Sequence, residues 1–135
     1  MKQTGFVLAA VILAVLLSGC SVQKKQKEGR KPIEYTIIED DEVPEGFQNM
    51  IEEESHTLMC LTWEDEDGIY IARGYGEQET SGYSIEVKEC SMQEGIIYIH
   101  TSLIGPAKDE KISDTPTCPY IVLRVQEKEK DVVFE

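Results

Sequence analysis

Histidine is scarce in this 135-residue chain, and the motifs of common hydrolases and nucleotide-binding enzymes are missing. The only two histidines are His56 and His100, and the sequence has no Gly-x-Ser-x-Gly elbow, no His-Glu-x-x-His pair and no phosphate-binding glycine loop. His56 is expected to close a helix, where a cation suits the helix dipole, and His100 to lie in a strand. The sequence therefore predicts a protein that is not an enzyme and that holds no cofactor.

Basic residues are also few beyond the N-terminal segment. Residues 33–135 contain 7 basic and 25 acidic residues, a net charge of −18, so nucleic acid phosphates and anionic membrane surfaces should repel this region. Three acidic clusters, at 39–42, 52–54 and 64–67, offer oxygen ligands that suit calcium. The cluster at 64–67 lacks the rest of an EF-hand loop, and its sequence is typical of a hairpin turn. We expect no nucleic acid partner and no metal site.

Cysteine occurs four times, and no two cysteines are spaced as in a Cys-x-x-Cys redox or metal motif. Cys20 follows an apolar N-terminal segment, which leaves Cys60, Cys90 and Cys118 in the rest of the chain. Because three is an odd number, at least one thiol stays unpaired, and the sequence leaves open whether the other two form a disulfide. Cys60, within Leu58-Met59-Cys60-Leu61, reads as a small buried hydrophobe.

No apolar run is long enough to span a membrane. The longest, 6–17, would make about 18 Å of helix, against a hydrocarbon core of roughly 30 Å. Lys2 before this run and the small residues after it are typical of a secretory signal, which we place at residues 1–19. The sequence at 17–20, Leu-Ser-Gly-Cys, resembles the bacterial lipobox, in which cleavage before the cysteine leaves a lipid-carrying first residue.

The lipobox resemblance implies a lipoprotein that is anchored through Cys20. Two acyl chains on the thioether, and usually a third such as palmitate on the new N-terminus, would each contribute about 0.8 kcal/mol per buried CH₂. The expected location is extracellular, at the outer face of the cell membrane, or at the outer membrane if the organism has one. The alternative is an ordinary secretory signal that happens to end in Gly-Cys.

The mature chain divides into a short basic segment and one acidic domain. Residues 20–32 carry five basic residues and one acidic residue, and they read as a flexible tether, with a specific lipid-headgroup site as the alternative. Residues 33–135 are enough for one domain with its own core, and they show no internal repeat.

A strand and a helix are expected at the start of this domain. Alternating apolar residues predict the strand at 33–38. Pro44 marks the start of a helix of about three turns. The face that this helix buries is expected to comprise Phe47, Met50, Ile51 and, less regularly, Ser55.

Three pairs of strands follow, each joined by a short turn. The predicted pairs are 57–64 with 69–75, 83–89 with 96–103, and 120–125 with 132–134. The turns are signalled by Asp67-Gly68, by Gln93-Glu94-Gly95 and by the charged segment 127–131. Strands joined by tight turns favour antiparallel pairing, so we expect an α+β fold with a mainly antiparallel sheet of about seven strands and one early helix. A β-sandwich is the alternative.

Several short segments in the C-terminal half match a known family in their order and spacing. They are Ser81-Gly82-Tyr83 at the start of a strand, Pro106 in a loop, Thr117-Cys118-Pro119-Tyr120 before a late strand, and the final Val132-Val133-Phe134. Together they resemble the PrcB C-terminal domain across roughly residues 70–135. The chain departs from the commoner pattern at Ser81, where a second glycine is frequent, and at Cys118, where a residue such as tyrosine is frequent.

The family takes its name from an accessory lipoprotein of a secreted protease complex. The resemblance therefore implies a noncatalytic subunit that binds an exported protein, such as a protease, and stabilises the complex. The alternatives are a direct protease inhibitor and a module that binds a small ligand or the cell envelope.

The residues that carry the resemblance have two interpretations. In the structural one, Gly82 supplies a bulge or a positive φ, Tyr83 packs with its hydroxyl at the rim, and Pro119 fixes an extended start of an edge strand. In the functional one, the loops around them lie at one end of the sheet and bind the partner. The candidate partner-binding residues are Thr80, Ser81, Gly82, Tyr83, Thr117, Pro119 and Tyr120.

Overall fold

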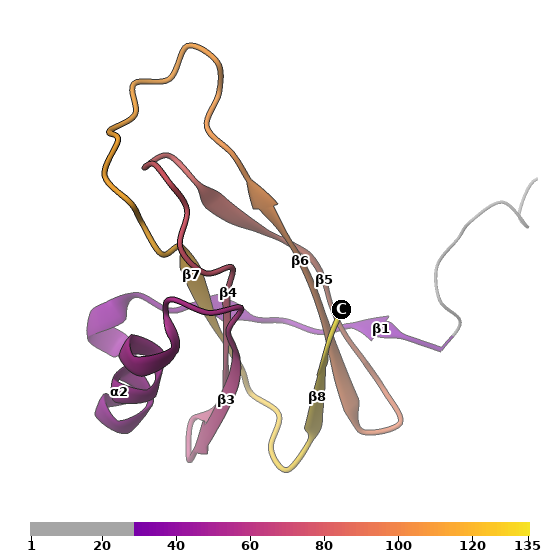
Figure 1. The fold of residues 1–135 in the computed structure, drawn as a ribbon. Coiled ribbons are helices and arrows are strands. Elements are labelled where there is room, and N and C mark those ends of the chain that lie inside the picture. Colours follow the sequence, from indigo (N-terminus) through magenta and orange to yellow (C-terminus); the bar gives the residue numbers. More distant parts are fainter. Residues whose placement is uncertain (1–28) are drawn as a thin grey trace, which may run out of the picture. The chain divides into compact units, whose positions relative to one another are not determined.

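The computed structural model describes residues 29–135, in which eight strands and one α-helix are formed (Figure 1). The predicted signal peptide at 1–19, the lipidation site Cys20 and the tether up to residue 28 lie outside the described residues. Within 29–135, no helix is long and apolar enough to cross a membrane.

The strands form two sheets of four strands each. The first, here called the outer sheet, has the order β1-β5-β6-β8, with β1 at Lys31–Pro32, β5 at Ser84–Gln93, β6 at Ile96–Ile104 and β8 at Asp131–Phe134. The second, here called the middle sheet, has the order β2-β7-β4-β3, with β2 at Thr36–Ile37, β7 at Tyr120–Val125, β4 at Gly68–Gly74 and β3 at Cys60–Asp65. All pairings are antiparallel except that of β6 with β8, which is parallel. With its one helix, the described chain has the predicted α+β fold.

Side chains alternate in direction along the middle sheet, and this places a core on each of its faces. On β4, Tyr70 and Ala72 face the helix α2 (Glu45–Glu54), whereas Ile69 and Ile71 face the outer sheet. Figure 1 shows the resulting order of layers, from α2 through the middle sheet to the outer sheet. The helix core comprises Ile38, Val43, Phe47, Ile51, Met59, Tyr70, Ala72 and Val122. The inter-sheet core comprises Ile69, Ile71, Cys90, Ile97, Ile99, Leu123 and Val125.

The helix begins after Pro44 and is ten residues long, as the sequence predicted. Phe47 and Ile51 are buried one turn apart, and the Phe47 ring centroid lies 5.9 Å from that of Trp63. Met50 was wrongly placed on this face. It is 37% exposed, because the helix turns it away from the sheet.

The predicted strand at 33–38 is wrong, because the chain changes sheets within it. Lys31 and Pro32, which we had assigned to the tether, pair with β5 of the outer sheet, and the Ile33 N–H donates to the Cys90 carbonyl at 3.0 Å. Thr36 then pairs with β7 of the middle sheet. Residues 33–35 therefore cross from one sheet to the other.

Two of the three predicted strand pairs are confirmed, β3 with β4 and β5 with β6. The third is wrong, because β7 and β8 belong to different sheets. β8 pairs with β6 instead, and its Val132 and Phe134 pack against the inter-sheet core. The connecting segment is fixed where the Glu129 N–H donates to the Glu64 carboxylate at 3.1 Å.

The cysteines of the described region are all free. Cys60 is exposed, so the prediction that it is buried is wrong. It lies on β3, an edge strand of the middle sheet. Leu61 and Trp63, whose side chains point to the opposite face of this strand, pack on the helix core instead. Cys90 is buried between the sheets. Burial raises the pKa of the Cys90 thiol to about 11, and the neighbouring Glu89 carboxylate adds to this shift.

Cys90 should therefore react with iodoacetamide at least about 100-fold more slowly than Cys60 at pH 8. The thiolate is the nucleophile, and at this pH a thiol with a pKa of about 11 is ionised to roughly one part in a thousand. Its burial slows the reaction further. A time course of alkylation on the folded chain, read peptide by peptide by mass spectrometry, measures both rates. Equal rates would show that the inter-sheet core opens freely.

Candidate functional site

Two long connections lie against each other at one end of the sheets (Figure 1). They are residues 75–83, between β4 and β5, and residues 105–119, between β6 and β7, and we call them together the two-loop surface. Gln78 and Thr117 exchange backbone hydrogen bonds of 2.7 and 3.0 Å, and the Thr117 hydroxyl donates to the Thr80 carbonyl at 2.7 Å. The loops that carry the predicted site residues are therefore held together, as the functional interpretation requires.

Ser81 adds a second link between the loops. Its N–H donates to the Ser113 carbonyl at 3.1 Å, and its hydroxyl oxygen accepts from the Ser113 N–H at 2.8 Å. A glycine at this position would lose the second of these bonds. The departure from the commoner family pattern at Ser81 thus strengthens the contact between the loops.

Gly82 has a φ of +91°, so the structural interpretation of this residue as a positive-φ position is confirmed. A β-carbon at residue 82 would lie 2.8 Å from the Pro106 Cβ and 3.0 Å from the Ile112 Cγ2. The absence of a side chain at Gly82 therefore lets the second loop pack directly on the first.

The remaining predicted site residues differ in where their side chains point. Tyr83 is half-buried, and its ring lies close to Gly105 in the second loop. Pro119 accepts a backbone hydrogen bond from Tyr75 at 3.4 Å, which extends the pairing of the loops. Tyr120 is turned away from this surface and packs against the helix core.

The Tyr120 hydroxyl donates to the Asp40 Oδ1 at 2.7 Å, and it thereby links β7 to the short helix η1 (Asp40–Glu42). Burial raises the pKa of Tyr120, and the hydrogen bond to Asp40 acts in the same direction. The structure gives Tyr120 a place in the packing of α2 and η1, apart from the other candidate residues.

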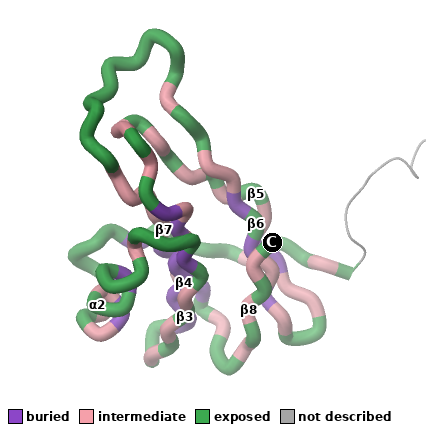
Figure 2. The backbone as a smooth tube through the Cα atoms, in the orientation of Figure 1, coloured by how far each residue is buried: buried purple, intermediate pink, exposed green. Residues whose placement is uncertain are grey.

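Sequence reasoning missed the apolar side chain that the two-loop surface exposes. Residues 107–116 are all exposed, and Figure 2 shows this loop as a continuous exposed stretch beyond the buried strands. Within it, Ile112 is 43% exposed and is flanked by Lys111 and Ser113. A lone isoleucine inside a long polar loop was the signal available in the sequence.

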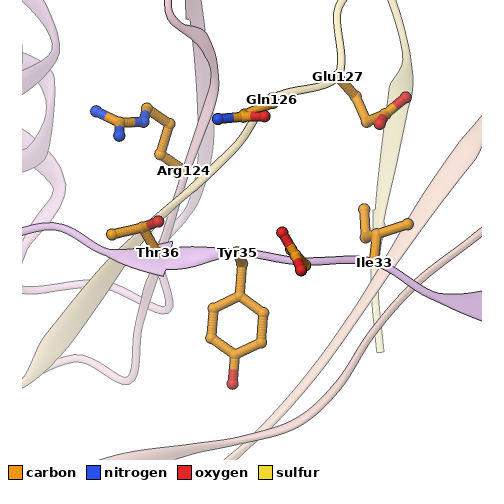
Figure 3. Close-up of a pocket in the computed structure, with 7 residues that line it drawn as sticks. Ile33, Tyr35, Thr36, Arg124, Gln126 and Glu127 are labelled. Atoms are coloured by element: carbon orange, nitrogen blue, oxygen red, sulfur yellow. The ribbon is translucent and has the colours of Figure 1, made fainter.

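A separate hollow of about 530 Å³ lies where the chain crosses between the sheets (Figure 3). It is lined by Ile33, Glu34, Tyr35, Thr36, Arg124, Gln126 and Glu127. Figure 3 shows the Arg124 guanidinium on one side of the hollow and the Glu127 carboxylate on the other, with the Tyr35 ring pointing away from both. The hollow is open and its charged groups are spread apart, so the two-loop surface is the stronger candidate for binding a protein.

One group of side chains in the described region has the composition of a metal site. It consists of His56, Glu77 and Cys118, whose ligand atoms all lie within 4.8 Å of one another. His56 follows α2 by two residues and is exposed. The sequence had led us to expect no metal site, and these three residues, which are far apart along the chain, form no spacing motif.

A family model matches part of the chain. Residues 69–126 match the family model described as PrcB C-terminal, a range that includes β4 to β7 and the whole two-loop surface. No curated protein and no solved structure matches the chain.

Proposed function

Because residues 69–126 match the PrcB C-terminal family model, we propose that this protein is a noncatalytic accessory subunit of an exported protease complex, which it binds and stabilises. A lipid on Cys20 anchors it to the outer face of the cell membrane, or to an outer membrane where there is one. The observation that carries the proposal is that the family match coincides with the two-loop surface. This is the part of the described chain in which two exposed loops are fixed to each other by hydrogen bonds.

The two-loop surface has the properties of a preorganised protein-binding site. Hydrogen bonds from Thr117, Ser81 and Ser113 hold its loops before a partner arrives, so that less conformational entropy is lost on binding. Ile112 is an exposed apolar side chain with charged residues on both sides, at 108–111 and at Asp114. Interfaces commonly have an apolar centre and a polar rim of this kind.

The charge of the domain favours a partner with a basic surface. Residues 33–135 carry a net charge of −18, which accelerates the encounter with a positively charged protein and repels the anionic membrane surface. A basic tether after the lipid would hold the acidic domain near the bilayer without bringing it onto the headgroups. Binding to the partner should accordingly weaken as the salt concentration rises.

Affinity purification of the tagged, full-length protein from its own cells should recover an exported protease in stoichiometric yield. The mass of the N-terminal peptide of the purified protein tests the anchor, since cleavage before Cys20 and acylation change it by a defined amount. An Ile112→Ser variant should recover much less of the protease, because Ile112 lies at the centre of the proposed interface.

Ile37→Ser is the matched control. Ile37 is 54% exposed on β2, in the middle sheet, so the change removes an isoleucine that is even more exposed than Ile112 from outside the two-loop surface. Equal recovery by both variants would place the interface elsewhere, and failure to recover any protein would contradict the accessory role. A recovered protease that is slowed by the purified domain would instead identify a direct inhibitor.

A further inference from the structure

Three ligand-type side chains from separate segments, two of them in the loops of the two-loop surface, converge on one point. The Cys118 Sγ lies 3.4 Å from the Nδ1 of His56, and the Glu77 Oε2 lies 3.6 Å from the same nitrogen. A single ring nitrogen has at most one hydrogen to donate, so it cannot donate to the thiol and to the carboxylate in two separate linear hydrogen bonds. A cation shared by the three groups accounts for both approaches.

Backbone hydrogen bonds hold the segments that carry these side chains in place. Gln78 pairs with Thr117, and Tyr75 donates to the carbonyl of Pro119, so that Glu77 and Cys118 lie within two paired segments. The segment that carries His56 is fixed by Met59, which exchanges two backbone hydrogen bonds with Gly74, of 3.1 and 2.9 Å. The fold therefore brings the three segments together, so that their side chains can meet at one point.

The distances from the His56 nitrogen to the other two ligand atoms fit tetrahedral zinc, and the third pair of atoms lies within 4.8 Å. Bonds of about 2.3 Å to sulfur and of about 2.0–2.1 Å to nitrogen or oxygen, at tetrahedral angles, place ligand atoms about 3.3–3.6 Å apart. The distances from the His56 Nδ1, 3.4 Å to sulfur and 3.6 Å to oxygen, agree with this geometry. A thiolate and an imidazole favour zinc over the hard cations calcium and magnesium.

The geometry points to a zinc site formed by His56, Glu77 and Cys118. The thiolate and the carboxylate balance the two positive charges of the ion, and binding releases the proton of the Cys118 thiol to solvent. The His56 and Glu77 side chains are 70% and 56% exposed, so the ion reaches the site from solvent and a water completes the fourth position. The bound ion joins the segment after α2 to both loops of the two-loop surface.

The test uses the full-length, detergent-purified chain after removal of metals with a chelator. Zinc titrated against a competing chromophoric chelator should bind with one ion per chain. Cobalt in its place should give the visible bands of a tetrahedral ion and a thiolate-to-metal charge-transfer band. Zinc should also slow the alkylation of Cys118 while leaving that of Cys60 unchanged.

Matched variants separate this site from adventitious binding. Cys118→Ser, His56→Gln and Glu77→Gln should each weaken zinc binding at least about tenfold, since even the loss of a group that only orients a ligand costs about that much. Cys60→Ser, His100→Gln and Glu79→Gln change the same residue types outside the group and should bind zinc as the unmodified chain does. Undiminished affinity in Cys118→Ser, or a cobalt spectrum without the thiolate band, would overturn the assignment.

The zinc site does not depend on the proposed protease partner. Metal affinity is measured on the isolated chain and partner recovery in the pull-down, so either result can fail without the other.

Discussion

A Phe47→Ala variant should lose about 3–5 kcal/mol of unfolding free energy. The Phe47 side chain is fully buried in the helix core, where its ring lies 5.9 Å from Trp63 and 6.5 Å from Tyr70 between ring centroids. Its removal leaves a cavity between α2 and the middle sheet that these large neighbours cannot fill without leaving their rotamers. Urea denaturation followed by tryptophan fluorescence measures the loss, because Trp63 is the only tryptophan and lies at this contact.

Met50→Ala tests whether the loss comes from packing. Met50 lies on the same helix but is 37% exposed, and alanine and methionine have similar helix propensities, so less than about 1 kcal/mol should be lost. Similar losses in the two variants would contradict the packing of α2 through Phe47.

The local elements of the fold could be predicted from the sequence because their signals are local. The helix is marked by Pro44 and by the spacing of Phe47 and Ile51, and the two tight hairpins by turn residues between alternating strands. In the second hairpin, the turn at Glu94 and Gly95 has positive φ at both residues, which is the conformation that short hairpins prefer.

The choice of partner strand could not be predicted, because it depends on the packing of distant residues. Apolar and polar side chains alternate along residues 33–38 as they would in one strand. However, the start of this segment pairs with the outer sheet and its end with the middle sheet. Likewise, nothing in the short turn before β8 indicates that β8 pairs in parallel with β6, or that Val132 and Phe134 pack, partly buried, against the inter-sheet core. Alternation shows which residues face a core but not which core they face.

The candidate site was predictable only in part for the same reason. The segments that resemble the PrcB C-terminal domain led us to place the loops around Gly82 and Thr117 at the same end of the sheet. The hydrogen bonds between these loops confirm that they lie together. The group of His56, Glu77 and Cys118 could not be predicted, because its members come together only when three distant segments pack. Metal motifs that sequence reasoning finds have ligands close to each other along the chain.

The second large effect is expected at the turn between β3 and β4, where Gly68→Ala should lower the unfolding free energy by about 2–4 kcal/mol. Gly68 has a φ of +133°, which is accessible essentially to glycine alone, and a β-carbon there would lie 2.0 Å from the Val125 carbonyl oxygen. The obstacle is backbone of β7, which is paired with β4 on one side and β2 on the other and cannot move aside as a side chain would. Denaturant unfolding of the variant measures the loss.

Gly95→Ala is the control that separates the two causes. Gly95 also has a positive φ, of +79°, but a β-carbon there would meet only the Lys130 side chain, at 3.9 Å. It should lose about 1–2 kcal/mol from the backbone conformation alone. If Gly68→Ala lost no more than Gly95→Ala, the close approach of β7 to the turn would not limit the fold. A clearly larger loss at Gly68 would show that the start of β4 is shaped by contact with the neighbouring strand as well as by its own turn.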